Sequence, residues 1–294
     1  MARILSTTSA GLRSDAEVLD WAHRSLGPLT VLEDVSSPHS TQRVLHCETR
    51  SAEPVIVKWF VDAPCFFNTL DTLNNHAVAL GSNAPKLIDH NETLRALVMT
   101  HVPGAPASSE QALDPTVHFA LGSLLRQFHD SAPANRSVDI AHELAGTLSR
   151  HLDVLESVIG EALAHDARTL AMELLDLDHI MLMPTHGAVS PEHTLIDHDR
   201  GVSVIGFSKS EYNPWIVDTA ILERDLWVYS PELRRAFYAG YEREPEPEDV
   251  LVLRAIQMIS SFDEWLEISA RRVSKSDRAR SIQRIESALG GTLF

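Results

Sequence analysis

Residues 184–220 read PTHGAVSPEHTLIDHDRGVSVIGFSKSEYNPWIVDTA, and this stretch holds two short runs that resemble strands. Residues 194–197 and 202–207 are short apolar runs, and the polar residues HDRG between them predict a turn. The two runs are therefore predicted to pair as a β-hairpin. We predict no other strands in the second half of the chain.

Predicted helices surround the hairpin. Apolar residues recur at i, i+4, i+7, i+8 and i+11 between residues 117 and 128, which is the spacing of one helix face. Residues 140–164 and 167–177 predict two further helices, and helical patterns resume at residue 218 and continue to the end. The second half is therefore predicted to be mainly helical.

Strands dominate the first half instead. A helix is predicted at residues 15–25, and three strand-like runs follow at residues 29–33, 42–48 and 55–60. A second helix at residues 66–80 and two strands at residues 86–89 and 95–100 complete this half.

A change in composition separates the two halves. VPGAPA at residues 102–107 combines proline and glycine, which interrupt regular structure. We place a boundary here, so that residues 1–101 form a small lobe with an antiparallel sheet and a helix. Residues 102–294 form a larger, mainly helical lobe that holds the hairpin. The predicted fold class is α+β, with the bilobal plan of a kinase-like fold.

Three stretches carry a family resemblance. Residues 94–107 (LRALVMTHVPGAPA), residues 121–133 (LGSLLRQFHDSAP) and residues 184–220 resemble the hinge, the following helix and the catalytic segment of the aminoglycoside phosphotransferase and choline kinase family. The resemblance spans about residues 29–225 and implies a protein-kinase-like fold with residues 1–101 as the nucleotide-binding lobe. One spacing departs from the family pattern, because three residues separate Pro214 from Asp218, as in homoserine-kinase-type relatives.

The composition restricts the classes of function. The 294 residues carry a formal net charge of −16, which argues against binding to nucleic acid or to anionic membranes, since these polyanions would repel the chain. No apolar run approaches the roughly 18 residues that span a bilayer, and the N-terminus has no apolar segment like that of a signal peptide. We therefore expect a cytoplasmic protein. Cys47 and Cys65 form no CxxC pair and are expected to be buried thiols.

The resemblance assigns nucleotide-binding positions in the first lobe. Lys58, in the run VIVKWF, matches the strand lysine that contacts the phosphates, and Thr100, His101 and Val102 match the hinge. ATP is therefore a candidate ligand. The strand pattern alone is also consistent with a solvent-facing Lys58 on an alternating strand, so the direction of this side chain stays open.

Two features of the family are weak in the first lobe. The glutamate that usually positions the lysine has no counterpart, because Asp71 is the only acid within the predicted helix. The loop VSSPHSTQ, residues 35–42, contains no glycine, although glycine lets backbone amides approach a phosphate closely. A phosphate-gripping loop is therefore not predicted.

The catalytic positions show three substitutions. The resemblance implies that His186 and Asp218 brace the catalytic loop, and both are present. Ala188 replaces the catalytic aspartate, and a methyl group cannot accept a proton. His193 replaces the metal-binding asparagine, and Gly206 replaces the main metal-binding aspartate. Imidazole suits zinc or iron better than magnesium, and glycine offers no side-chain ligand, so magnesium is not expected.

Neighbouring groups offer few replacements. Glu192 is adjacent to His193 and is the candidate substitute for the missing carboxylate. Asp197 and Asp199 are expected to face away, because one ends a strand and the other lies in the turn. The histidines near this loop lack the spacing of a metal-binding motif, so no metal site is predicted. A hydrolase is also disfavoured, because the chain has no GxSxG sequence.

These features lead to two main hypotheses. The first is a pseudokinase, a degenerate family member that acts as a binding or scaffolding partner of a protein or peptide. The resemblance extends to degenerate relatives that work with a lyase on a precursor peptide in peptide natural-product biosynthesis. The second is an active ATP-dependent phosphotransferase that acts on a hydroxyl group of a small molecule or peptide with rearranged catalytic residues. A third, weaker hypothesis is a structural partner whose cleft binds no nucleotide.

Overall fold

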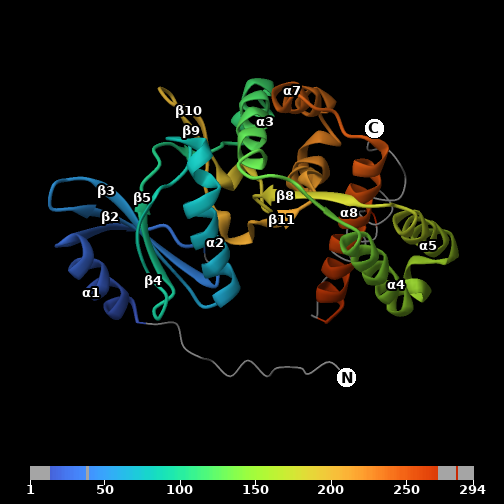
Figure 1. Cartoon of the computed structure of the whole chain (residues 1–294), viewed down its shortest axis with the longest axis horizontal. Helices are drawn as coiled ribbons and strands as arrows, with labels where there is room; N and C mark the ends of the chain where they lie inside the picture. The colour runs from blue at the N-terminus through green and yellow to red at the C-terminus, as the bar shows by residue number, and fades with distance from the viewer. Residues whose placement is uncertain (1–13, 38–39, 271–282, 284–294) are drawn as a thin grey trace. The chain divides into compact units, whose positions relative to one another are not determined.

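The computed structural model describes residues 14–37, 40–270 and 283 of the chain. These residues form two compact units. Unit 1 comprises the described part of Met1–Ala105 together with Leu195–Ser210, and unit 2 comprises Pro106–Thr194 together with the described part of Glu211–Phe294. Figure 1 shows a sheet flanked by helices in unit 1 and mostly helices in unit 2. The predicted α+β, kinase-like fold class is confirmed.

Five antiparallel strands build the main sheet of unit 1, in the order β1-β2-β3-β5-β4. The strands are β1 (Leu29–Asp34), β2 (Gln42–Thr49), β3 (Pro54–Phe60), β4 (Leu87–Asn91) and β5 (Ala96–Thr100). Side chains alternate between the two faces of the sheet. On one face, Val55, Val57 and Trp59 of β3 share a core with Val18 and Trp21 of helix α1 (Asp15–Leu26).

The opposite face of β3 carries Lys58 and is covered by helix α2 (Ala63–Asn75). Phe66 of α2 meets Phe60 of β3 edge to face, with ring centroids 5.9 Å apart. The helix begins three residues earlier than the predicted residue 66. It also ends before residue 80, because the 3-10 helix η1 (Ala77–Leu80) follows it.

The predicted hairpin is present, and Leu195–Ser210 place it in unit 1. It forms a sheet of order β10-β9-β6, whose strands are β6 (Ala105–Pro106), β9 (Thr194–Asp197) and β10 (Gly201–Val204). Asp197 closes the turn, because its Oδ1 accepts the backbone N–H groups of Asp199 and Arg200 at 3.0 and 2.9 Å. The hairpin is therefore stabilised by a carboxylate at its own turn.

Helices form most of unit 2. The α-helices are α3 (Pro115–His129), α4 (Asp139–Ile159), α5 (Glu161–Leu175), α6 (Ala220–Leu222), α7 (Pro231–Tyr241) and α8 (Pro247–Ala270). The short connecting helices are η2 (Gln111–Leu113), η3 (Pro191–His193), η5 (Trp215–Thr219) and the π-helix η6 (Glu223–Trp227). A small sheet of order β11-β8-β7 completes the unit, with strands β7 (Asn135–Ser137), β8 (Ile180–Thr185) and β11 (Glu211–Asn213).

Helices α3 and α7 approach closely because glycines lie at their contact. A Cβ atom at Gly122 of α3 would collide with the backbone of Phe237, and a Cβ atom at Gly240 of α7 would collide with the backbone of Phe119. Only glycine therefore permits this spacing between the two helices.

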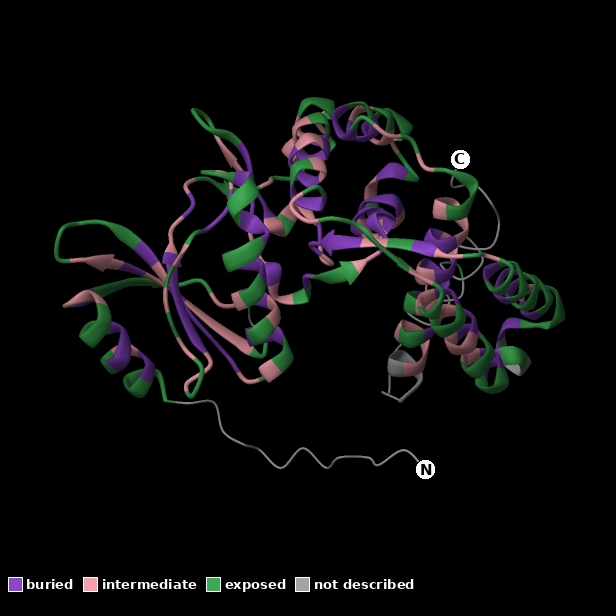
Figure 2. Ribbon diagram, in the orientation of Figure 1, coloured by how far each residue is buried: buried purple, intermediate pink, exposed green. Residues whose placement is uncertain are grey.

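The structure differs from the sequence prediction in two places in unit 2. The small sheet was not predicted, and its central strand β8 is largely buried (Figure 2). The break between α4 and α5 falls at Gly160, whose φ of 83° suits glycine, rather than near residues 165–166.

Two other predictions are not tested by the structure. The helix predicted after residue 270 lies outside the described residues, and the lobe boundary between residues 101 and 102 stays a prediction. In the described part of the chain, no helix has the length and apolar character needed to cross a membrane.

Candidate functional site

A buried carboxylate in unit 2 holds the predicted catalytic loop. Asp218, in η5, accepts the backbone N–H of His186 at 2.8 Å through Oδ2 and that of Gly187 at 2.6 Å through Oδ1. Hydrogen bonds to a charged acceptor at these lengths are strong. The structure therefore brings together His186 and Asp218, the two residues that the sequence suggested as braces of the loop.

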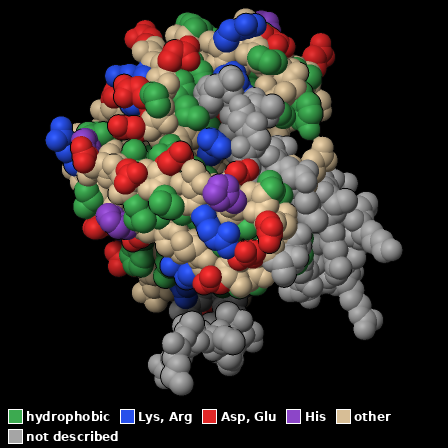
Figure 3. All heavy atoms as spheres, turned by 90° about the vertical axis from the view of Figure 1, so that its right-hand side faces the viewer, with side chains coloured by type: hydrophobic (Ala, Val, Ile, Leu, Met, Phe, Trp, Pro, Cys, Tyr) green, Lys and Arg blue, Asp and Glu red, His purple; other side chains and the backbone are tan. Residues whose placement is uncertain are grey.

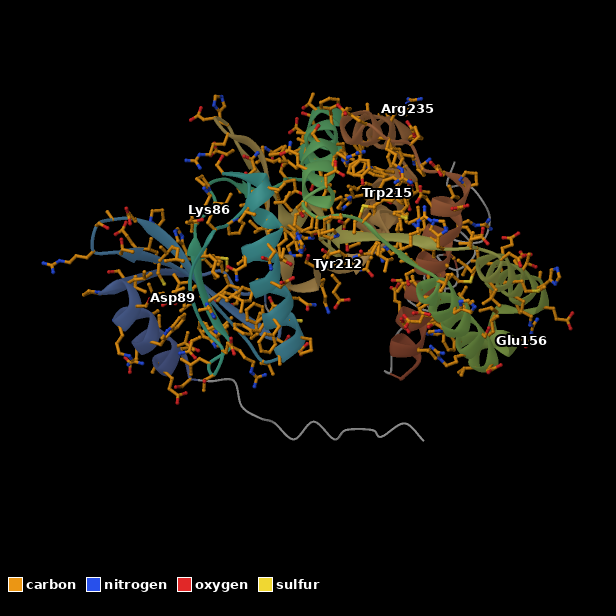
Figure 4. All side chains as sticks on the ribbon, viewed as in Figure 1. Lys86, Asp89, Glu156, Tyr212, Trp215 and Arg235 are labelled. Carbon is orange, nitrogen blue, oxygen red and sulfur yellow. The ribbon has the colours of Figure 1, made fainter. Side chains whose placement is uncertain are left out.

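Asp218 is held in turn by the ends of α3 and α7. His129 Nε2 lies 2.9 Å from Asp218 Oδ2, and His129 Nδ1 lies 2.7 Å from the hydroxyl oxygen of Tyr241. Burial raises the pKa of the Asp218 carboxyl group, but the hydrogen bond and charge of His129, together with His186, outweigh burial and hold this pKa below its ordinary value. The ring of Trp215, labelled in Figure 4, stacks on Tyr241 with centroids 4.6 Å apart.

Two of the three substituted positions lie in this loop and contact each other. His193 Nδ1 donates to the carbonyl oxygen of Ala188 at 2.8 Å, because a carbonyl group can only accept. The neutral imidazole of His193 therefore carries its proton on Nδ1 and a lone pair on Nε2. The backbone N–H of Ala188 donates to His186 Nδ1 at 3.2 Å. His186 and His193 therefore both form hydrogen bonds within the loop.

The carboxylates that lie near the loop in the sequence take no part in these hydrogen bonds. Glu192, the candidate substitute, has an exposed side chain on η3. Asp197 is engaged in the hairpin turn, and Asp199 is exposed beside His198. The expectation that Asp197 and Asp199 face away stays a prediction.

In unit 1, Lys58 is buried, with 8% of its surface exposed, so it is not a solvent-facing lysine. Burial lowers its pKa from 10.5 to about 8, and the neighbouring Cys65 opposes that effect. Its Nζ lies 4.9 Å from the centroid of the Phe60 ring. Among the described residues, no carboxylate forms an ion pair with Lys58.

The helix residue beside Lys58 is a cysteine rather than a glutamate. Cys65 lies in the first turn of α2, and its thiol donates to Asp62 Oδ2 at 3.3 Å. Burial and Asp62 raise the pKa of this thiol, whereas the positive charges of two lysines lower it. Asp71, the only acid predicted in this helix, is mostly exposed and pairs with neighbours on its own side of the helix, so it does not position Lys58.

The third substituted position begins a short turn in unit 1. Gly206 has a φ of 90° and precedes the 3-10 helix η4 (Phe207–Lys209), which packs on α2. Phe207 is buried, whereas Lys209 is exposed, and its charge helps to lower the pKa of the Cys65 thiol. This segment therefore contributes a cation and no carboxylate.

The predicted hinge residues lie at the end of β5 and directly after it, in unit 1. Thr100 pairs with the backbone of Lys86, through its N–H and through its Oγ1, each at 2.9 Å. The imidazole ring of His101 stacks in parallel on that of His46, with centroids 4.4 Å apart, and burial and His46 lower the pKa of His101. Val102 is buried. Thr100 and His101 are therefore engaged in contacts within unit 1.

The sequence also matches a protein-family model. The model described as the phosphotransferase enzyme family matches residues 41–251, which is more than half of the chain. The chain belongs to this phosphotransferase family. None of the curated proteins matches its sequence.

Solved structures of phosphotransferases share the fold of this family member. The macrolide 2′-phosphotransferase of Brachybacterium faecium is 16% identical over 94% of this chain and 97% of its own, with a TM-score of 0.61. The aminoglycoside phosphotransferase of Alicyclobacillus acidocaldarius is 16% identical over 99% of this chain and 97% of its own, with a TM-score of 0.63. Aminoglycoside 2′-phosphotransferase-IIIa, in its GDP complex, is 11% identical over 95% of this chain and 99% of its own, with a TM-score of 0.68. At these identities, the likeness shows the fold alone.

The phosphotransferase family implies a magnesium ion, and the residues present do not fit one. Magnesium prefers carboxylate, carbonyl and water oxygens. Ala188 and Gly206 have no side-chain oxygen, and His193 offers a nitrogen. Within the described ranges, no group of three or more His, Cys, Asp and Glu side chains is placed to hold a metal ion. The donor set of this phosphotransferase-family chain therefore disagrees with that of a magnesium site.

Several residues around Lys58 and Asp218 were not among the predicted site residues. Cys65 and Lys209 flank the buried lysine region, and Tyr241 supports Asp218 through His129. The chain contains only four lysines, and this scarcity was a reason to examine Lys209 as a candidate. Tyr241 lies too far along the sequence for any spacing rule to connect it with the loop.

Proposed function

We propose that this phosphotransferase-family chain is a pseudokinase, which binds a ligand or partner and does not transfer phosphate. One observation carries the proposal. The loop is braced by the buried Asp218, while Ala188 and Gly206 supply none of the carboxylates that would accept a proton or hold a metal. The frame of the site is kept, and its reactive groups are replaced.

The magnitudes support binding over transfer. Loss of a general base typically lowers a rate by about 10²–10⁴-fold. Phosphoryl transfer relies further on positioning and on neutralising charge with metal ions, so the loss of their ligands adds to that deficit. His193 does not restore a magnesium site, because it offers a nitrogen where magnesium prefers oxygen.

The partner that we propose is a protein or peptide, such as a precursor peptide that is processed together with a lyase. The resemblance to degenerate relatives of that kind supports this proposal. The net charge of −16 favours a cationic partner over nucleic acid or an anionic membrane. On the face drawn in Figure 3, acidic and basic side chains are interspersed, so this face offers no single-sign patch. A cytoplasmic location is part of the same proposal.

A turnover assay tests the proposal. The purified full chain is incubated with radiolabelled ATP and magnesium or manganese, with and without serine- and threonine-rich basic peptides. We expect no ADP or phosphopeptide above the level of a protein-free control. Turnover that disappears in the variant Lys58→Ala would overturn the proposal.

The second candidate function is an active phosphotransferase, and His193 is the observation that favours it. Its Nε2 lone pair is not used in closing the loop and could accept a proton from a hydroxyl group. This candidate predicts turnover that is lost in His193→Asn or Glu192→Gln and kept in His198→Asn, because His198 is fully exposed.

A further inference from the structure

The π-helix η6 is a feature of unit 2 that the catalytic loop does not explain. The backbone N–H of Val228 donates to the carbonyl oxygen of Glu223 at 3.2 Å, which is the i to i+5 hydrogen bond of a π-helix. Such helices are rare, and single turns of this kind often lie at functional sites. In this chain, a titratable side chain ties each end of η6 to a neighbouring helix.

The first residue of η6 is tied to α7. The Glu223 side chain is fully buried, and its Oε2 accepts a hydrogen bond from Arg234 Nη2 at 2.5 Å. Its Oε1 is also buried and has no hydrogen-bond partner among the described residues. An ionised carboxylate away from water is costly unless several hydrogen bonds hold it. The geometry therefore favours the protonated, neutral form of Glu223.

The last residue of η6 is tied to α3. Trp227 Nε1 donates to His118 Nδ1 at 3.1 Å, and His118 Nε2 donates to the carbonyl oxygen of Ala112 at 2.9 Å. One ring nitrogen of His118 must accept and the other must donate, so the imidazole is neutral. A second proton would occupy Nδ1 and break the bond to Trp227. His118 is 2% exposed, so this charge would also be buried.

The surrounding charges agree with these two neutral forms. Burial raises the pKa of Glu223 to about 7, although Arg234 opposes that effect. Burial lowers the pKa of His118, although the bond to Ala112 and the charge of Asp114 oppose it. The other titratable or charged groups on the packed elements are Tyr238 of α7, which burial keeps neutral, Arg224 and Asp225 of η6, which pair with each other, and Glu264 of α8, which acts on Arg224.

We propose that η6 is a pH-sensitive joint, which the neutral forms of Glu223 and His118 hold closed. Loss of the Glu223 proton leaves a buried charge with one hydrogen bond and favours opening at α7. Gain of a proton by His118 breaks the tie to Trp227 and favours opening at α3. The joint responds to pH whether or not the chain transfers phosphate.

The position of η6 connects this joint with the catalytic loop. Only the three residues of α6 separate η6 from η5, which holds Asp218. Asp218 accepts the backbone N–H groups of His186 and Gly187. Opening of η6 should therefore loosen the brace of the loop, so that proton uptake and release regulate the loop from a distance.

Amide hydrogen exchange of the full chain between pH 5 and 8.5 tests the proposal. Rates for residues 220–228 and for the amides of His186 and Gly187 are divided by those of an unstructured peptide at the same pH. The folded pKa of Glu223 lies above its ordinary 4.5, so its contribution to stability is lost as pH rises through 7. This contribution should make opening at least about tenfold easier at pH 7 than at pH 5, and level above pH 7.

Variants separate the two ties. Glu223→Gln mimics the protonated acid, so the ratio of opening in the wild type to opening in this variant isolates Glu223. His118→Asn keeps an acceptor for Trp227 and should lose only the opening at acid pH. Glu232→Gln removes an exposed acid of α7 and should behave like the wild type.

Two outcomes would overturn the proposal. One is a ratio of wild type to Glu223→Gln that does not change with pH. The other is opening in His118→Asn, which retains the carboxylate, that stays constant between pH 5 and 7. Exchange that rises at residues 220–228 while His186 and Gly187 stay unchanged would overturn the connection to the loop. Because no nucleotide is present, these results are independent of the turnover assay for the proposed function.

Discussion

His193 donates to the carbonyl oxygen of Ala188 across 2.8 Å, so two of the three substituted positions in this chain are bonded to each other. The substitutions therefore add an internal contact while they remove reactive groups. The position that the family resemblance assigns to a metal ligand is therefore occupied by a side chain that bonds to the backbone of the loop.

The first prediction concerns this contact. His193→Asn should lower the melting temperature by about 2–4 °C, because a hydrogen bond contributes about 1 kcal/mol and a domain of this size shifts by that amount. His198→Asn is the control and should change nothing, since the His198 side chain is fully exposed. Differential scanning calorimetry measures both. Equal melting temperatures for the two variants would show that the contact contributes nothing.

The second prediction concerns acid. The pKa of Asp218 lies below its ordinary value of 3.8 in the folded protein. Its charged form therefore adds stability that is present above the unfolded pKa and is lost as pH falls through the folded pKa. Asp218→Asn should cost about 2–4 kcal/mol at neutral pH, because buried N–H groups lose a charged acceptor.

Denaturant titrations between pH 2 and 7 measure this effect. The variant should show a flatter fall in unfolding free energy at acid pH than the wild type. Asp199→Asn, at an exposed position, should keep the wild-type profile. A wild-type slope in Asp218→Asn would contradict the assignment.

The third prediction concerns Lys58. Its folded pKa of about 8 lies below the ordinary 10.5, so the unfolded chain binds more protons between these values. The stability of the free protein should therefore rise as pH increases from about 8 to 10.5, and stay at its lower level below about pH 8. The shift corresponds to about 3 kcal/mol.

Lys58→Met should accordingly be more stable than the wild type at pH 7, by about 1–3 kcal/mol, because a buried charge is removed. It should also lose the alkaline rise. Lys86→Met should show neither change. A less stable Lys58→Met would mean that the lysine serves the packing of unit 1 rather than a ligand.

The fourth prediction concerns Gly206. Its φ of 90° is unfavourable for any other residue, so Gly206→Asp should cost about 1–2 kcal/mol. Gly201→Asp is a matched control, since its φ is 78° and nothing lies near its Cβ position. Both variants should lose similar stability in thermal unfolding. Neither variant should produce ADP while Ala188 lacks a carboxylate.

The sequence predicted the elements with strong local patterns. The hairpin at residues 194–204 has a polar turn between apolar runs, and the first-half strands are rich in β-branched residues. β8 escaped prediction because Ile180–Thr185 reads IMLMPT, where methionine, leucine and proline hide the strand pattern. Its pairing with β7 and β11 depends on tertiary contacts that no local rule reports.

The candidate site likewise contains residues that could be predicted from the sequence and residues that could not. His186 and Asp218 were predicted because their spacing in residues 184–220 resembles a family pattern, and the structure places them together. The burial of Lys58 could not be derived, since the strand pattern does not show which face of the sheet the Lys58 side chain lies on. Cys65 and Lys209 could not be paired with it either, because three separate elements must fold before their charges meet.

The glycines at the contact of α3 and α7 indicate where destabilising mutations of this protein should arise. Gly122 and Gly240 set how near the two helices lie, and the C-terminal ends of those helices carry His129 and Tyr241. An alanine at either glycine would wedge the helices apart and loosen Asp218 without touching it. In a genetic screen, Gly122 and Gly240 are where heat-sensitive alleles of this protein should accumulate.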